Sequence, residues 1–145
     1  MADTRVETVY SVTGYYDGPV SGIANFHNRP HAFERDDEAD DGFDLFLVQP
    51  IDDETFEMAM EDWAIWTRWE KAFYSKQTST ETHPALPEDR PRHTQIDPIL
   101  KSRLQIDPAK AVKAHGKFKV TSFDEIGGKR IAVKWQVEWL QNGET

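Results

Sequence analysis

Cysteine is absent from the 145-residue sequence, and basic side chains are outnumbered by acidic ones. Without thiols the chain can form no disulfide, no thiolate nucleophile and no thiolate zinc site, a composition that suits the reducing cytoplasm. The 17 Lys and Arg residues stand against 26 Asp and Glu residues, giving a formal net charge of -9. This field repels phosphate backbones and anionic head groups, so we expect no nucleic-acid partner and no membrane partner.

Long apolar runs are also missing. No run reaches the about eighteen residues of a membrane-spanning helix, and the first residues lack the basic and apolar regions of a signal peptide. We therefore expect a cytoplasmic protein. Aromatic residues, by contrast, make up 12% of the chain, enough bulky material for one core at this length. The sequence predicts a single domain over residues 1–145, with a proline-rich connecting segment at about 77–92.

Three stretches in the first fifty residues are β-capable. Alternation over 6–16 places Val6, Tyr10, Val12 and Tyr16 on one side of a predicted strand. Residues 20–26 and 31–35 flank a turn-forming stretch at 28–30 and predict a hairpin. The apolar run 43–48 predicts a central strand that ends before Pro50.

Two helices are expected in the middle of the chain. Asp52 is placed to cap the first, with Ile51 and Phe56 at the positions of a hydrophobic staple. Apolar residues then recur at helical spacing with no Gly or Pro to about residue 75. A shorter helix is predicted to start with Asp97 as its cap and Pro98 as its first residue, and to run to about residue 103.

The C-terminal third predicts an antiparallel hairpin. Apolar residues alternate over 112–120 and again over 131–139, and a loop with Gly127 and Gly128 joins the two runs. A competing helix from Pro108 to about residue 115 fits this alternation less well. We predict an α+β fold: an antiparallel sheet, made of the N-terminal strands and this hairpin, packed on one long aromatic-rich helix and a shorter helix.

The common sequence motifs for catalysis, nucleotide binding and metal binding are absent from the sequence. Residues 37–48 fail the EF-hand pattern, because Ala39 and Val48 occupy positions that need oxygen ligands. His27 and His31 flank a predicted turn, but no third metal ligand is evident. No local signature of a hydrolase, a nucleotide binder or a zincin occurs. We assign no catalytic residue, no metal and no cofactor.

The long helix is apolar on two sides. One stripe also contains Glu70, a carboxylate that leaves the core at that turn, hydrogen-bonds a nearby Tyr or Arg, or lines a binding site; its apolar members are Phe56, Ala59, Met60, Trp63 and Tyr74. The second side carries Met58, Ile65 and Trp69. It is either covered by Leu86, Ile96, Ile99 and Leu100 of the following segment, or it forms the interface of a homodimer or a protein partner.

Three stretches carry a resemblance to other proteins. The opening YYDGPVSGIA (15–24), the helix segment EDWAIW (61–66) and the loop THPALP (82–87) resemble a group of small bacterial proteins of similar size. The likeness spans about two thirds of the chain. The group has no assigned activity, so the resemblance implies a bacterial source and adds no functional residue.

Two functions are compatible with these features. We expect a non-catalytic cytosolic protein-interaction module that binds a basic protein partner, because acidity and a two-sided aromatic helix are present while catalytic signatures are not. The alternative is a small-molecule-binding protein or enzyme with an aromatic pocket between the sheet and the long helix. Its lining candidates are Tyr16, His31, Trp66 and Glu70.

Overall fold

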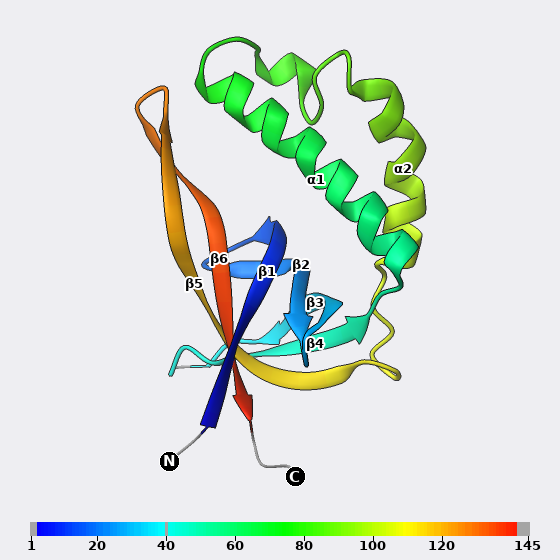
Figure 1. Ribbon diagram of the computed structural model, residues 1–145, viewed down its shortest axis with the longest axis vertical. Coiled ribbons are helices and arrows are strands. Elements are labelled where there is room, and N and C mark those ends of the chain that lie inside the picture. The colour runs from blue at the N-terminus through cyan, green and yellow to red at the C-terminus, as the bar shows by residue number, and fades with distance from the viewer. Residues whose placement is uncertain (1–2, 40, 142–145) are drawn as a thin grey trace. The chain divides into compact units, whose positions relative to one another are not determined.

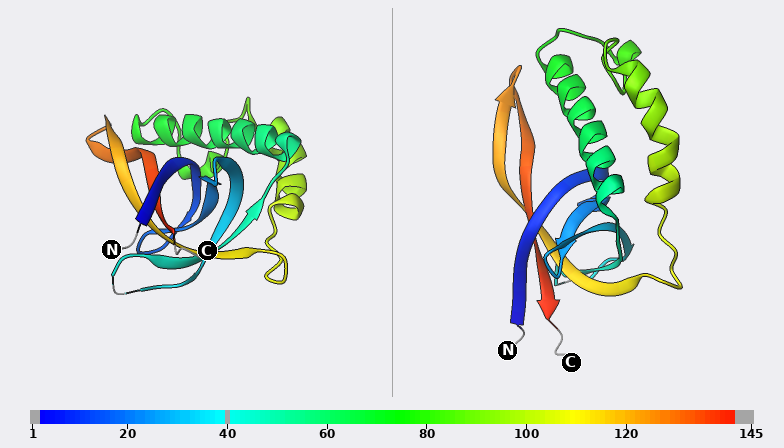
Figure 2. Two further views of the ribbon diagram at one scale, coloured as in Figure 1. Left: turned by 60° about the horizontal axis from the view of Figure 1, so that its bottom comes forward. Right: turned by 45° about the vertical axis from the view of Figure 1, so that its right-hand side comes forward.

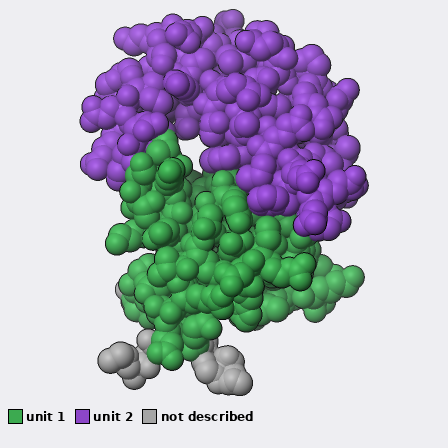
Figure 3. Space-filling view, in the orientation of Figure 1, with its two compact units in different colours: residues 1–51, 106–122, 133–145 green, residues 52–105, 123–132 purple. Residues whose placement is uncertain are grey.

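The contacts of the chain divide it into two compact units. A computed structural model describes residues 3–39 and 41–141. Unit 1 comprises residues 1–51, 106–122 and 133–145, and unit 2 comprises 52–105 and 123–132 (Figure 3). Each unit has a hydrophobic cluster made of its own residues. The single domain expected over residues 1–145 stays a prediction. Unit 2 combines the segment inserted between the fourth and fifth strands with the tip of the last hairpin.

Unit 1 is a closed antiparallel barrel (Figures 1 and 2). Each strand pairs with the next in the sequence, and the last strand pairs with the first through partners such as Val9 and Trp135. The predicted α+β class and antiparallel sheet are confirmed, while the closure of the sheet was not foreseen. The strands are β1 (Asp3–Tyr15), β2 (Pro19–Phe26), β3 (Arg29–Asp37), β4 (Asp44–Pro50), β5 (Val112–Ile126) and β6 (Lys129–Gln141).

Aromatic side chains fill the barrel. Phe33 and Phe46 meet edge to face at 5.7 Å, and Trp139 crosses Phe46 at 90°. Gly116 is required here, because a side-chain carbon would collide with the Trp139 indole. The buried cluster comprises Ala24, Phe33, Phe46, Val48, Ala114, Val137 and Trp139. The apolar alternation predicted for residues 112–120 and 131–139 supplies Ala114, Phe118, Val137 and Trp139 to this core, whereas Val112 and Val133, at the same parity, are exposed.

The inward side of β1 differs from the prediction. Val6 and Tyr16 were placed on the apolar side, yet both are exposed, whereas Glu7 and Ser11 are buried. Val9, which has the same parity as Glu7, packs on the aromatic cluster. The prediction was wrong because this strand buries two polar side chains and exposes an apolar one, so hydrophobicity alone gives the opposite orientation.

Glu7 has a structural role that explains its burial. The turn between β2 and β3 consists of His27 and Asn28, both left-handed, one residue before the predicted position. The amides of these two residues donate to the two Glu7 carboxylate oxygens, at 3.0 and 2.7 Å. A buried carboxylate is stabilised by such bonds, so β1 holds the β2–β3 turn in place.

The long helix of unit 2, α1 (Asp53–Tyr74), begins and ends close to the predicted residues. Asp52 caps it by accepting a 2.8 Å hydrogen bond from the Thr55 amide. Gly127, in the two-residue turn of the β5–β6 hairpin, has a positive φ and touches the Tyr74 carbonyl so closely that a side chain would overlap it. A 3₁₀ turn, η1 (Thr80–Thr82), interrupts the connecting segment.

The second helix, α2 (Arg90–Arg103), starts seven residues before Asp97, which was predicted as its cap. Asp97 and Pro98 therefore lie inside the helix. An interior proline costs about 3 kcal/mol through a lost hydrogen bond and a steric clash. Ile96 and Leu100, on either side of Pro98, are both buried. Each can contribute about 1.5–3 kcal/mol, which offsets that cost.

Candidate functional site

The four predicted pocket residues do not form one cluster within either unit. In unit 1, Tyr16 follows β1 and is 76% exposed, while His31 lies on β3 opposite Ala24, toward the other end of β2. The His31 imidazole packs edge-on against Phe26, and burial lowers its pKa from the ordinary value. Trp66 and Glu70 belong to unit 2, one turn apart on α1.

Trp66 belongs to an aromatic stack along α1. Its ring stacks on Trp69 at 5.3 Å, and Trp69 stacks in turn on Phe73 at 5.0 Å. His83 meets the Trp69 ring edge-on at 4.8 Å. The Trp69 indole N–H donates to the Thr82 hydroxyl at 2.9 Å, so the polar atom of the buried ring is satisfied. These contacts make the stack part of the packing of unit 2 and leave no aromatic cage.

Glu70 is half-buried beside this stack. Burial raises the pKa of its carboxyl above the ordinary value, and desolvation is the cause. An acid without a balancing cation is destabilised in its charged form at neutral pH. The raised pKa makes Glu70 an unusual carboxyl, but a single carboxyl with a shifted pKa does not define a functional site.

The second apolar side of α1 is covered within the chain. Ile65 is 2% exposed and packs with Ala85 and Ile96, and Met58 packs against the same cluster. Trp69 is 5% exposed. Of the two alternatives for the side with Met58, Ile65 and Trp69, this burial favours intrachain cover over an interface with a homodimer or a protein partner. Ile96 and Leu100, two of the residues weighed as intrachain cover, are buried on α2, whereas Ile99 is exposed.

Acidic side chains gather where β3 ends and β4 begins. We call the described residues 36–39 and 41–44 the acidic loop. Asp36, Asp37, Glu38 and Asp41 are all exposed there. Residues 35–38 line an open hollow on this part of unit 1. The exposed carboxylates therefore lie beside a hollow that is itself lined by acidic residues.

The mostly buried Arg35 side chain forms ion pairs with two carboxylates of the acidic loop. This side chain is 8% exposed and lies 3.6 Å from Glu38 and 3.7 Å from Asp44. The same guanidinium donates to the backbone carbonyls of Tyr16 and Asp17. Its charge is thus used inside unit 1, while the outer carboxylates face solvent.

Hydrogen bonds fix the backbone of the acidic loop. The Ala39 amide donates to Asp44 at 2.9 Å, and the Phe43 amide donates to Asp41 at 3.0 Å. The Lys117 ammonium lies over the Phe43 ring at 4.4 Å. These contacts hold the Ala39 and Phe43 amides of the described loop residues within unit 1.

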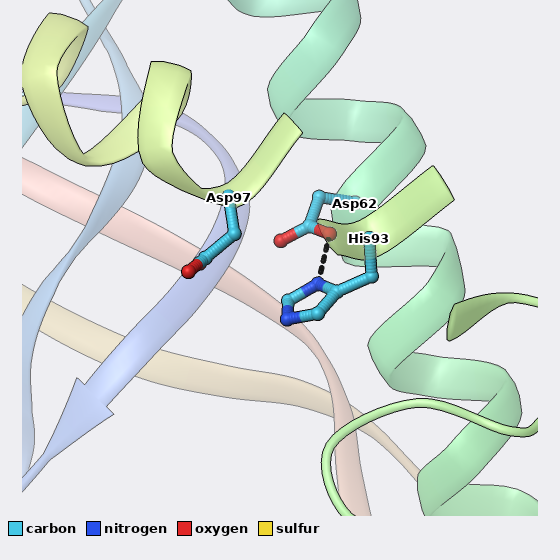
Figure 4. Close-up of side chains that lie close together, drawn as sticks. All are labelled: Asp62, His93 and Asp97. Atoms are coloured by element: carbon cyan, nitrogen blue, oxygen red, sulfur yellow. Dashed lines mark hydrogen bonds and ion pairs between the residues drawn. The ribbon is translucent and has the colours of Figure 1, made fainter. Parts of the chain in front are cut away.

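A second group of polar side chains converges in unit 2. Asp62 projects from α1, and His93 and Asp97 project from α2 toward the same point (Figure 4). Their ligand-type atoms all lie within 4.8 Å of one another. The His93 Nδ1 donates to Asp62 at 2.7 Å, and all three residues are partly buried.

Sequence reasoning missed this group. The signal that could have found it is the spacing of His93 and Asp97, four residues apart, which places two ligands on one face of a helix. That signal was hidden because Asp97 was interpreted as a helix cap, which leaves His93 outside the predicted helix. Nothing in the local sequence distinguishes Asp62 from the other carboxylates of the long helix.

Comparisons with known proteins add no relative. No family model, no curated protein and no solved structure matches the chain. The resemblance to a group of small bacterial proteins therefore stays an expectation. Among the described residues, no helix combines the length and the apolar character needed to cross a membrane.

Proposed function

We propose that the chain is a non-catalytic interaction module that binds a basic segment of a protein partner through the acidic loop. The observation that carries this proposal is the arrangement of exposed carboxylates around Arg35. Because the guanidinium is already bonded to Glu38, Asp44 and two backbone carbonyls, it does not neutralise the outer face of the loop. A lysine- or arginine-rich segment would supply the missing positive charge.

The charge of the whole chain supports the same partner chemistry. A net charge of -9 accelerates encounter with a basic partner and disfavours an acidic one. The hydrogen bonds of the Ala39 and Phe43 amides restrict the described loop residues and so lower the entropy cost of binding. We place this activity in the reducing cytosol, a location that suits a chain without cysteine.

Calorimetric titration with a lysine- and arginine-rich peptide tests the proposal. The loop variant is Asp36→Asn, Asp37→Asn and Glu38→Gln, which keeps the shapes of the side chains and removes their charges. Exposed ion pairs are worth about 0.5 kcal/mol each, so loss of three should weaken binding by about tenfold. Raising the salt concentration should weaken peptide binding by the natural chain. It should also narrow the difference in peptide affinity between the natural chain and the loop variant.

A matched control separates the acidic loop from net charge. The variant Glu57→Gln, Glu88→Gln and Glu125→Gln removes the same number of charges from exposed positions of unit 2. We expect it to bind the peptide within about twofold of the natural chain, since screening limits distant charges. Equal weakening of both variants, or no peptide binding at low salt, would show that the loop is not the binding surface.

A further inference from the structure

We propose that Asp62, His93 and Asp97 form a binding site for one divalent transition-metal ion of the zinc type in unit 2. The group offers one imidazole nitrogen and one oxygen from each of two carboxylates, which converge from α1 and α2 (Figure 4). Mixed nitrogen and oxygen ligands of this kind suit Zn²⁺ and similar ions. They do not suit Ca²⁺ or Mg²⁺, which take oxygen ligands. This inference is independent of the proposed function.

The spacing of the three side chains is close to what one ion requires. Ligands bound at about 2.1 Å on opposite sides of an ion are about 4.2 Å apart, and tetrahedral ligands are closer. The ligand-type atoms here lie within 4.8 Å of one another. Binding of the ion would replace the 2.7 Å hydrogen bond between His93 and Asp62 and draw the more distant ligand atoms together.

The helices fix the ligands from both sides. Ile65 is three residues from Asp62 on α1, and Ile96 is three residues from His93 on α2. These two isoleucines are almost fully buried in one cluster, so the core lies directly beside the three ligands and sets the distance between the helices. A site built on two packed helices holds its geometry better than one on loops.

The charges favour a cation. The carboxylates of Asp62 and Asp97 both lie close to His93. Among the described residues, the exposed Lys101 ammonium, 3.1 Å from Asp97, is the one lysine or arginine group paired with either carboxylate. The neighbouring guanidiniums are bound elsewhere, Arg92 to Glu61 and Arg68 to Asp89. A divalent ion would balance both carboxylates and leave at least one coordination position for water.

A purely structural role for His93 is the competing explanation. Other ion pairs join the same two helices, among them Glu61 with Arg92 and Glu54 with Arg103. In those pairs one guanidinium meets one carboxylate. The pair of His93 and Asp62 differs because Asp97 lies one helical turn farther along α2 on the same side. Asp97 is not needed for the pair, so it distinguishes the two explanations.

The decisive variant is therefore Asp97→Asn, which keeps the hydrogen bond between His93 and Asp62. Zn²⁺ binding is measured by competition with a chromophoric chelator, and Co²⁺ serves as a spectroscopic probe of the ligand set. We expect one Zn²⁺ per chain, an increase in melting temperature on adding Zn²⁺, and at least tenfold weaker binding by the variant. Without metal, the variant and the natural chain should melt at the same temperature.

His93→Gln should also lose the site, and Co²⁺ should then lack the absorption changes due to imidazole coordination. His115→Gln is the matched control, since this half-buried histidine lies on β5 in unit 1. The proposal is overturned if Asp97→Asn binds Zn²⁺ as tightly as the natural chain. It is equally overturned if His115→Gln weakens binding as much as His93→Gln, which would indicate adventitious binding at surface histidines.

Discussion

The buried carboxylate of Glu7 offers the sharpest test of the barrel. One carboxylate oxygen accepts a hydrogen bond from the His27 amide, and the other accepts a hydrogen bond from the Asn28 amide. In Glu7→Gln, whichever way the new amide is turned, its NH₂ group faces one of these N–H donors. The variant therefore loses one charge-assisted hydrogen bond and leaves a partly buried amide without its Glu7 acceptor.

Each of these two effects costs about 1.5–2 kcal/mol, so we expect a loss of about 3 kcal/mol in the free energy of unfolding. With a urea dependence of about 2 kcal/mol/M, the unfolding midpoint of unit 1 should fall by about 1.5 M. The reporter is the NMR signal of the Trp139 indole N–H, which donates to the Asn25 carbonyl in the barrel.

Glu34→Gln is the matched control. Glu34 is exposed on β3, and its substitution should change the free energy of unfolding by less than about 0.5 kcal/mol. If Glu7→Gln is as stable as this control while the β2–β3 turn keeps its conformation, Glu7 does not hold the turn. The structural explanation for its burial would then be refuted.

Two further predictions concern α1. Trp69→Glu should cost several kcal/mol and lose much of the helical circular dichroism, because Trp69 is buried; a folded variant would contradict this burial. For Glu70, burial raises the folded-state pKa above the unfolded-state value. Its charged form is therefore disfavoured in the folded protein, and the stability it contributes below the unfolded pKa is lost as pH rises through the folded pKa. Glu70→Gln should remove this loss and be more stable than the natural chain at neutral pH. Urea unfolding at several pH values would show the difference. An equal or lower stability of the variant would contradict the desolvation of Glu70.

The sequence predicted local structure well where neighbouring residues decide it. Asp52 caps α1 because its side chain reaches an amide three residues away, and the turn at Gly127 follows from two adjacent glycines. The alternation that placed Ala114 in the core and Lys117 in solvent depends only on the pleat of one strand. Such features need no knowledge of distant segments.

Prediction failed where distant segments decide the outcome. In β1, Glu7 is buried because its carboxylate meets a turn twenty residues later, and no pattern within β1 indicates that partner. The start of α2 was misplaced because Asp97 and Pro98 form a good local helix start. Packing of Ile96 and Leu100 favoured an earlier beginning, and the spacing of His93 and Asp97 on one helix became apparent only then.

The sequence by itself determined the antiparallel strands, the long helix and its cap, and the acidity on which the proposed partner depends. Only the tertiary structure decided that the sheet closes, that Trp69 is buried within the chain, and that Asp62 meets His93 and Asp97. The physical reason is the range of the forces involved. Propensity, capping and alternation act over a few residues, whereas burial and the convergence of side chains depend on which remote segments pack together.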